Sequence, residues 1–234
     1  MEIFYSTDIQ SGFIVLGDDE SRHCTKVLRK QVGDTIQVID GKGHLFKGVI
    51  ESIPKNKPTK ILITKKTFYD AAQSKSGFHL AIAPTKNADR MEWLLEKTVE
   101  LGIDSITFLM CDNSERTNLK YDRLERIAIS ALKQSAQYWM PQIIGPVKFK
   151  SFLEQTFASS NTFIAHCYNT DKQSFVLPKS TADALVLIGP EGDFSQSEVE
   201  LAIARGFKPI TLGNSRLRTE TAALHACSIF RNSK

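Results

Sequence analysis

Hydrophobic residues follow one pattern over the first 67 residues of the chain and a different pattern after about residue 78. In the first part, apolar and polar residues alternate over 35–40, and residues 44–50 return as a partner strand after a glycine-rich turn at 41–43. A further strand is expected over 60–64. Several short strands joined by basic turns are typical of a small β-barrel.

In the second part, short apolar segments alternate with long amphipathic ones, which predicts a mainly parallel sheet covered by helices. Helices are expected over 88–101 and 122–138, and a Ser195–Glu198 capping box predicts the start of another, which Gly206 ends. Strands are expected at 78–83, 105–110, 162–167, 184–188 and 209–212. Residues 68–77 lack periodicity, so we expect a β-barrel over 1–70, a linker over 71–77 and an α/β domain over 78–234.

Two glycine-containing loops follow neighbouring strands of this predicted sheet, at 187–194 and 212–222. Open α/β sheets bind ligands at the edge where such loops meet. Glycines without a Cβ let the backbone approach a flat ligand closely. The second loop is also unusually rich in charge for a turn, with Arg216, Arg218 and Glu220. Together the loops indicate a ligand site.

A helix is expected over about 19–30, with Asp18 or Asp19 as its N-cap. At α-helical spacing its cations form one stripe, made of Arg22, Lys26, Arg29 and Lys30, and its apolar side carries Cys24, Val27 and Leu28. A charged helix face often does no more than contact solvent, but a stripe of one sign is also suited to phosphate contacts.

The helix over 88–101 is expected to bury Met91, Leu94, Leu95 and Thr98, while its other side carries Lys86, Arg90, Trp93 and Lys97. Two interpretations of the tryptophan remain open. It belongs to the core, as most tryptophans do, or it stacks on a nucleic-acid base among the cations.

Composition restricts the remaining possibilities. The net charge is +4, and the first 75 residues carry +3 of it, which weakly favours a polyanion-binding module beside a nearly neutral domain. No segment approaches the ~20 apolar residues that span a bilayer, and the N-terminus lacks a signal-peptide pattern, so a cytoplasmic protein is expected. The four cysteines are dispersed, which predicts reduced thiols and no metal site.

With these motifs in place, the chain resembles the 16S rRNA (uracil(1498)-N(3))-methyltransferases, which are SPOUT-class RNA methyltransferases. The similarity covers nearly the whole length. The matching residues are His23, 27–29 and 33–34 in the first part; 89–93, Lys97, 100–102, 115–116 and 134–135 in the middle; and 189–192, 212–213 and 217–222 at the end.

The resemblance implies a fold, a cofactor and a partner. The fold is an N-terminal PUA-like β-barrel and an α/β domain whose mainly parallel sheet contains a trefoil knot. S-adenosylmethionine is expected in the knot, 16S rRNA of the small ribosomal subunit is the expected substrate, and the protein is expected to be a homodimer. The implied cofactor-binding residues are Ile188, Gly189, Pro190, Glu191, Gly192, Leu212, Gly213, Leu217 and Thr219.

Roles for charged residues follow from the expected reaction at uracil N3. Arg218 is the first choice for stabilising negative charge on the uracil carbonyls, and Glu220 orients that arginine or accepts a proton. Glu191 is a second carboxylate of interest, or a residue that closes its loop by bonding backbone amides. The residues expected to contact RNA are Arg22, His23, Lys26, Arg29, Lys86, Arg90 and Arg116.

Three positions depart from the family pattern: Asp193 stands where a second glycine is usual, Gln137 where an arginine is common, and Ser215-Arg216 where an arginine precedes a branched apolar residue. Two other functions therefore remain open. One is a methyltransferase of the same fold acting on another RNA site. The other is a ribosome-assembly factor that binds RNA without catalysis.

Overall fold

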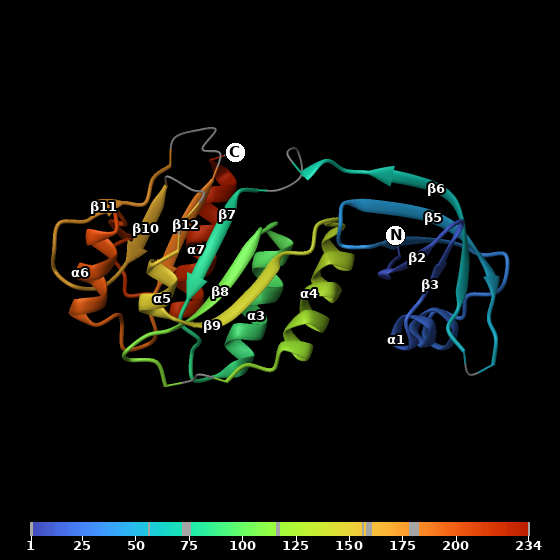
Figure 1. Cartoon of the computed structure of the whole chain (residues 1–234), viewed down its shortest axis with the longest axis horizontal. Helices are drawn as coiled ribbons and strands as arrows, with labels where there is room; N and C mark the ends of the chain where they lie inside the picture. Colours follow the sequence, from blue (N-terminus) through green and yellow to red (C-terminus); the bar gives the residue numbers. More distant parts are fainter. Residues whose placement is uncertain are drawn as a thin grey trace. The chain divides into compact units, whose positions relative to one another are not determined.

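The computed structural model describes residues 2–55, 57–71, 76–115, 118–155, 157, 161–177 and 183–233. The chain forms two compact units (Figure 1). The N-terminal unit consists of residues 1–75 together with 129–140, and the C-terminal unit consists of 76–128 together with 141–234.

The N-terminal unit is built on a curled six-stranded sheet (Figure 1). Its strands, in the spatial order β1-β4-β5-β6-β3-β2, are β1 (Ile3–Tyr5), β4 (Thr35–Ile39), β5 (His44–Ser52), β6 (Lys60–Phe68), β3 (Phe13–Val15) and β2 (Asp8–Gln10). Among these described strands, β1 and β4 pair in parallel and the other neighbours are antiparallel. The predicted hairpin is the β4–β5 pair, and inward-facing residues such as Phe4, Val38 and Phe46 form the core.

The predicted helix over 19–30 is wrong in its second half. An α-helix, α1 (Asp18–Arg22), is followed by a π-helical turn, η1 (His23–Val27). The N-cap residue of α1 is Gly17 and not Asp18 or Asp19 as predicted, and no side chain caps the helix. Because a π-turn is wider than an α-turn, side chains lie on other faces than α-helical spacing predicts: Val27 is 65% exposed, whereas Cys24 is buried. At Arg29 the backbone adopts a φ of 54°.

The end of helix α4 (Tyr121–Ser135) and the residues after it belong to the N-terminal unit. Lys133 forms an ion pair with Glu20, and the Tyr138 ring stacks on Tyr69 with centroids 4.0 Å apart. The indole of Trp139 donates a hydrogen bond to the Tyr69 carbonyl. Residue 69 is therefore packed against this segment, and of the predicted linker only 71, 76 and 77 lie within the described residues.

The C-terminal unit contains a seven-stranded sheet in which every described pair is parallel. In spatial order its strands are β11 (Gln173–Ser174), β13 (Lys208–Thr211), β10 (Thr162–Ala165), β12 (Ala184–Ile188), β7 (Phe78–Ile82), β8 (Ser105–Met110) and β9 (Gln142–Lys148). The five predicted strands are all present. The sequence pattern did not reveal the two edge strands, β9 and β11.

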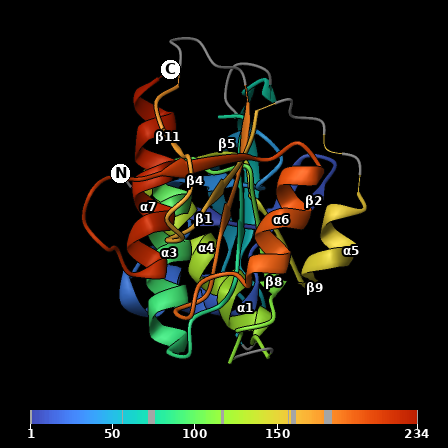
Figure 2. The same cartoon turned by 90° about the vertical axis from the view of Figure 1, so that its left-hand side faces the viewer.

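Helices cover both faces of this sheet (Figure 2). Helices α3 (Ala88–Glu100) and α7 (Thr219–Asn232) lie on one side and contact each other, and α5 (Phe149–Leu153) and α6 (Gln196–Ala204) lie on the other. The central strand β12 is therefore buried along its whole length, as strands of doubly covered parallel sheets are. The predicted capping box at Ser195 and Glu198 begins α6, and Gly206 follows its end.

Candidate functional site

A cavity of about 820 Å³ lies within the C-terminal unit, where β10, β12 and β13 reach their carboxyl ends. Its walls come from residues 165–167, 188–191 and 210–219, with Arg90, Lys172, Asp193 and Ala222. The two loops singled out in the sequence therefore share one cavity. Eight of the nine residues expected to bind cofactor line it: Ile188, Gly189, Pro190, Glu191, Leu212, Gly213, Leu217 and Thr219.

Gly192, the ninth, lies outside the cavity wall among the described residues and serves the loop's packing. Its carbonyl accepts a hydrogen bond from the side-chain amide of Asn113, and a Cβ at 192 would lie 3.3 Å from the Asn113 Cβ. Gly189 is needed for a different close approach, because a Cβ there would lie 3.0 Å from the Phe194 amide nitrogen.

Glu191 adopts one of the two roles considered from the sequence. Its carboxylate accepts a hydrogen bond from the Lys86 backbone N–H at 3.0 Å. This contact ties the loop after β12 to the segment that leads into α3. Glu191 is thus a loop-closing residue in this structure, while it also borders the cavity.

Arg218 lies on the cavity wall as the N-cap residue of α7, and Glu220 is in the first turn of that helix. The Glu220 side chain is buried, with its Oε1 3.6 Å from Nε of Arg90. Its Oε2 has no hydrogen-bond partner within the part of the chain that the structure describes. The observed partner of Glu220 is therefore Arg90, which lines the cavity, whereas Glu220 is not among the described lining residues. A role for Glu220 in orienting Arg218 stays a prediction.

The residues expected to contact RNA are divided between the two units. Arg22, His23, Lys26 and Arg29 belong to the N-terminal unit, Lys86 and Arg90 to the C-terminal unit, and Arg116 lies outside the described residues. Two of the four cations in the predicted stripe have acidic partners: Arg22 pairs with Asp19 at 3.0 Å, and Lys30 pairs with Glu2.

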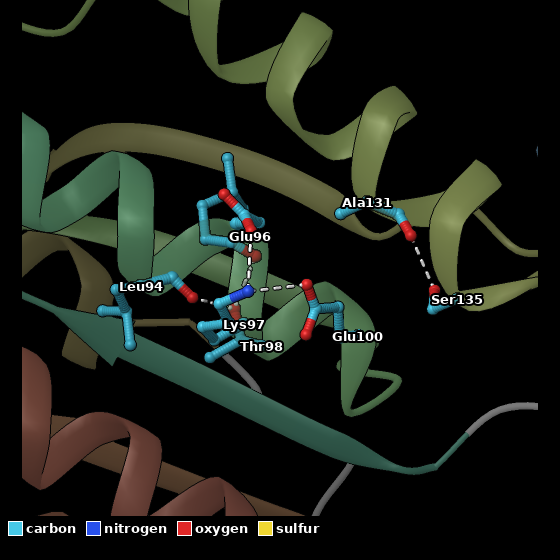
Figure 3. Close-up of polar contacts among 8 residues, drawn as sticks. Leu94, Glu96, Lys97, Thr98, Glu100, Ala131 and Ser135 are labelled. Carbon is cyan, nitrogen blue, oxygen red and sulfur yellow. Dashed lines mark hydrogen bonds and ion pairs between the residues drawn. The ribbon is translucent and has the colours of Figure 1, made fainter.

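Trp93 on helix α3 is exposed, so it is not a core residue, and the interpretation as a base-stacking residue stays a prediction. The surrounding cations are largely paired, however. Figure 3 shows the Lys97 ammonium between the carboxylates of Glu96 and Glu100, at 2.7 and 2.8 Å. Lys86 likewise pairs with Glu115. Thr98, on the buried side, donates to the Leu94 carbonyl (Figure 3).

The cavity residues outside the two predicted loops include three with titratable side chains that the sequence did not suggest: His166, Cys167 and Lys172. His166 directly follows β10, and both of its ring nitrogens are buried without a hydrogen-bond partner among the described residues. Burial lowers the pKa of His166, and the nearby Lys172 acts in the same direction while Asp193 opposes it. The available signal was His166 and Cys167 at the end of the predicted strand 162–167, followed by a run of mostly polar residues that includes Lys172.

Within the described ranges, no group of three His, Cys, Asp or Glu side chains is placed to hold a metal ion. The cysteines are all free thiols; three are buried, and Cys167 is exposed. Among the helices that the structure describes, none combines the length and hydrophobicity needed to cross a membrane.

Comparison with known proteins now identifies the family. Residues 72–231 match the RNA methyltransferase domain, and residues 16–63 match the RNA methyltransferase PUA domain. A ribosomal RNA small subunit methyltransferase E from Buchnera aphidicola subsp. Acyrthosiphon pisum (strain APS) is 31% identical over 230 residues, covering 92% of this chain and 85% of the relative. The chain belongs to the ribosomal RNA small subunit methyltransferase E family.

Solved structures of this enzyme class share the fold. A "probable rRNA-methyltransferase" from Porphyromonas gingivalis is 41% identical, with a TM-score of 0.88 and coverage of 97% of this chain and 96% of the other. The "putative methyltransferase Lpg2936" from Legionella pneumophila, solved with its bound cofactor SAM, is 27% identical, with a TM-score of 0.83 and coverage of 98% of this chain and 96% of the other. The expected SPOUT-type α/β fold with a PUA-like N-terminal sheet is confirmed, and the protein is an RNA methyltransferase.

The structure explains how this member of the family accommodates Asp193 in place of the usual glycine. Asp193 has a φ of 65°, in the left-handed region that favours glycine. Its carboxylate accepts hydrogen bonds from the amides of Cys167 at 2.6 Å and Phe194 at 2.8 Å. Aspartate is among the few residues that tolerate this backbone region, and its side chain here also links the ends of β10 and β12.

Proposed function

We propose that this protein transfers a methyl group from S-adenosylmethionine to N3 of uridine 1498 in the 16S rRNA of the small ribosomal subunit. The observation that carries the proposal is the single cavity formed by the 188–193 and 210–219 loops. The named relatives act on small-subunit rRNA, and the Legionella structure holds SAM, which supports both substrate and cofactor.

The cavity residues fit this cofactor. A volume of about 820 Å³ lies within the ~300–1,000 Å³ typical of small-molecule pockets. The wall combines apolar side chains such as Ile188 and Leu217 with the polar groups of Thr219 and His166. We assign the cofactor to Ile188, Gly189, Pro190, Glu191, Leu212, Gly213, Leu217 and Thr219, with Gly192 shaping the loop behind them.

When bound, S-adenosylmethionine supplies an electrophilic methyl group on a sulfonium. The proton on uracil N3 must pass to a base, for which Glu220 is proposed below. The N3 electron pair then forms the bond to the methyl carbon while the bond from that carbon to sulfur breaks and leaves a neutral thioether. The protein must align the nitrogen with the methyl group and stabilise negative charge on the uracil carbonyls.

Arg218 suits the charge-stabilising role, because its guanidinium fork matches a planar oxyanion and the residue lies on the cavity wall at the N-cap of α7. Glu220 has one buried oxygen without a partner among the described residues. Because this oxygen is available, we propose that Glu220 accepts the N3 proton or helps to orient Arg218.

Recognition of RNA is assigned to both units. We propose that residues 1–70 form the RNA-binding module, with Arg22, His23, Lys26 and Arg29, and that residues 78–234 form the catalytic domain after a linker over 71–77. Lys86, Arg90 and Arg116 are the contacts proposed for the catalytic domain. We further propose that the protein works as a homodimer in the cytoplasm, where its ribosomal substrate is made.

The first test of this function is a transfer assay with S-adenosylmethionine carrying a tritiated methyl group. Small subunits lacking the modification are expected to accept the label, and large subunits are not. Naked 16S rRNA serves as a parallel substrate, which separates recognition of sequence from recognition of the assembled particle. Absence of label in every RNA, from folded protein, would contradict the proposed activity.

A further inference from the structure

His166 is the buried polar residue of the cavity that no role described so far accounts for. It follows β10 directly, lines the cavity, and is only 6% exposed. Within the described part of the chain, Nδ1 and Nε2 of its ring both lack a hydrogen-bond partner. Buried polar groups in folded proteins are nearly always hydrogen-bonded. A ligand in the cavity is therefore the natural source of the missing partner.

The polar groups around His166 already have other partners. The Lys172 ammonium donates to the backbone carbonyl of His166 at 3.0 Å, not to its ring. The Asp193 carboxylate accepts from the Cys167 and Phe194 amides. The Tyr168 ring lies 5.9 Å from the imidazole, and its hydroxyl donates to the Phe194 carbonyl. The protein thus holds the imidazole in place without using either nitrogen.

The environment also selects the chemical type of the partner. Burial lowers the pKa of His166, and Lys172 acts in the same direction, so the ring is neutral near neutral pH. A neutral imidazole has one donor nitrogen and one acceptor nitrogen. A hydroxyl group, or the edge of a purine, can satisfy either nitrogen without carrying charge.

We propose that His166 is a cofactor-binding residue that hydrogen-bonds an uncharged polar group of the adenosine part of S-adenosylmethionine. The assignment rests on the proposed function. It favours the adenosine part because the methionine part of the cofactor bears an ammonium, a carboxylate and the sulfonium. The nucleoside supplies the uncharged donors and acceptors that match a neutral ring.

The test compares two ligands on two variants by isothermal titration calorimetry. His166→Phe removes both ring nitrogens and keeps an aromatic ring at the position. Tyr168→Phe is the matched control, because its hydroxyl bonds the Phe194 carbonyl and the residue is not part of the cavity wall. The ligands are S-adenosylmethionine and 5′-methylthioadenosine, which retains the nucleoside and lacks the amino-acid part.

We expect His166→Phe to raise the Kd of both ligands by about tenfold, as loss of a buried hydrogen bond does, while Tyr168→Phe changes neither by more than about twofold. Unchanged Kd values for His166→Phe would overturn the assignment. A loss confined to S-adenosylmethionine would overturn it as well, because the contact would then lie at the amino-acid end. A wild-type protein that binds neither ligand would contradict the proposed function itself.

A second measurement covers the case in which His166→Phe does not fold. In wild-type protein labelled with ¹⁵N-histidine, the ring signals of His166 are identified by their disappearance in His166→Gln. Addition of 5′-methylthioadenosine is expected to shift these signals. Signals that stay unchanged at saturating ligand would overturn the assignment.

Discussion

At the scale of single residues, the site could be predicted where the chemistry is local and was missed where it depends on distant partners. Gly189 was recognisable because it directly follows a buried strand, and Arg218 because it directly precedes a helix. His166 gave no such signal, since its burial and its lack of partners among the described residues depend on where β10 ends. The pairing of Glu220 with Arg90 joins residues that are far apart in the sequence, and could not be inferred.

Arg218 provides the first prediction at this scale. If its guanidinium stabilises charge mainly in the transition state, Arg218→Ala should lower kcat by about 100-fold, the effect typical of losing one such donor, and leave the Kd of S-adenosylmethionine nearly unchanged. Single-turnover kinetics and calorimetry measure the two quantities. Arg216→Ala, at a neighbouring cavity residue, is the control. A large loss of cofactor affinity in Arg218→Ala would place this arginine in the cofactor site instead.

Asp193 provides a prediction about stability. Its positive φ is tolerated by glycine and aspartate but costs a residue with a plain Cβ about 1 kcal/mol or more. Asp193→Ala removes the carboxylate hydrogen bonds and keeps the strain, whereas Asp193→Gly removes them and relieves the strain. Denaturant unfolding should therefore find Asp193→Ala less stable than Asp193→Gly by about 1 kcal/mol. Equal stability would show that the backbone at 193 is not strained.

At the scale of elements, periodicity predicted central strands and long helices well, and edges poorly. The buried strand β12 and the helix α3 follow from continuous or amphipathic patterns. The edge strand β9 contains Gly145 and Pro146, which interrupt a strand pattern. The π-turn η1 was missed because its sequence also fits an α-helix, and the buried position of Cys24 agrees with either geometry.

The capping box of α6 allows a test at this scale. Ser195 Oγ accepts from the Glu198 amide and also donates to the Asp112 carboxylate at 2.6 Å. Ser195→Ala should cost about 1 kcal/mol and lower Tm by about 2–4 °C in a chain of this size. Ser197→Ala, in the first turn of the same helix, is the comparison variant. A Tm equal to that of the wild type would mean that the cap contributes nothing to stability.

At the scale of the whole molecule, the sequence predicted two kinds of fold in one chain, a β-rich part followed by a parallel α/β part. The change from strand hairpins to alternating strands and helices made this possible. The assignment of residues 129–140 to the N-terminal unit could not be predicted, since it depends on contacts such as the Tyr69–Tyr138 stack. The spacing of cations along the sequence also did not reveal which of them could contact RNA, because several, such as Arg22 and Lys97, are paired with carboxylates.

The proposed RNA-binding module makes a prediction about salt dependence. Lys26 and Arg29 form no ion pair with any residue that the structure describes, whereas Arg22 is paired with Asp19. Lys26→Gln combined with Arg29→Asn, which tolerates the positive φ at 29, should weaken RNA binding. It should also reduce the slope of log K against log salt by about one for each phosphate that the variant no longer neutralises.

Filter binding over a range of salt concentrations measures this slope. Lys60→Gln is the matched control, since Lys60 is paired with Glu51 in the same unit. A slope that does not change in the double variant would show that the RNA is held elsewhere on the protein.

The central claim is the identity of the modified nucleoside, and mass spectrometry tests it most directly. Small subunits without the modification are incubated with the protein and S-adenosylmethionine, their 16S rRNA is digested, and the methylated nucleosides and fragments are identified. The account predicts 3-methyluridine at one site, uridine 1498. A different methylated nucleoside, or 3-methyluridine at another position, would contradict it.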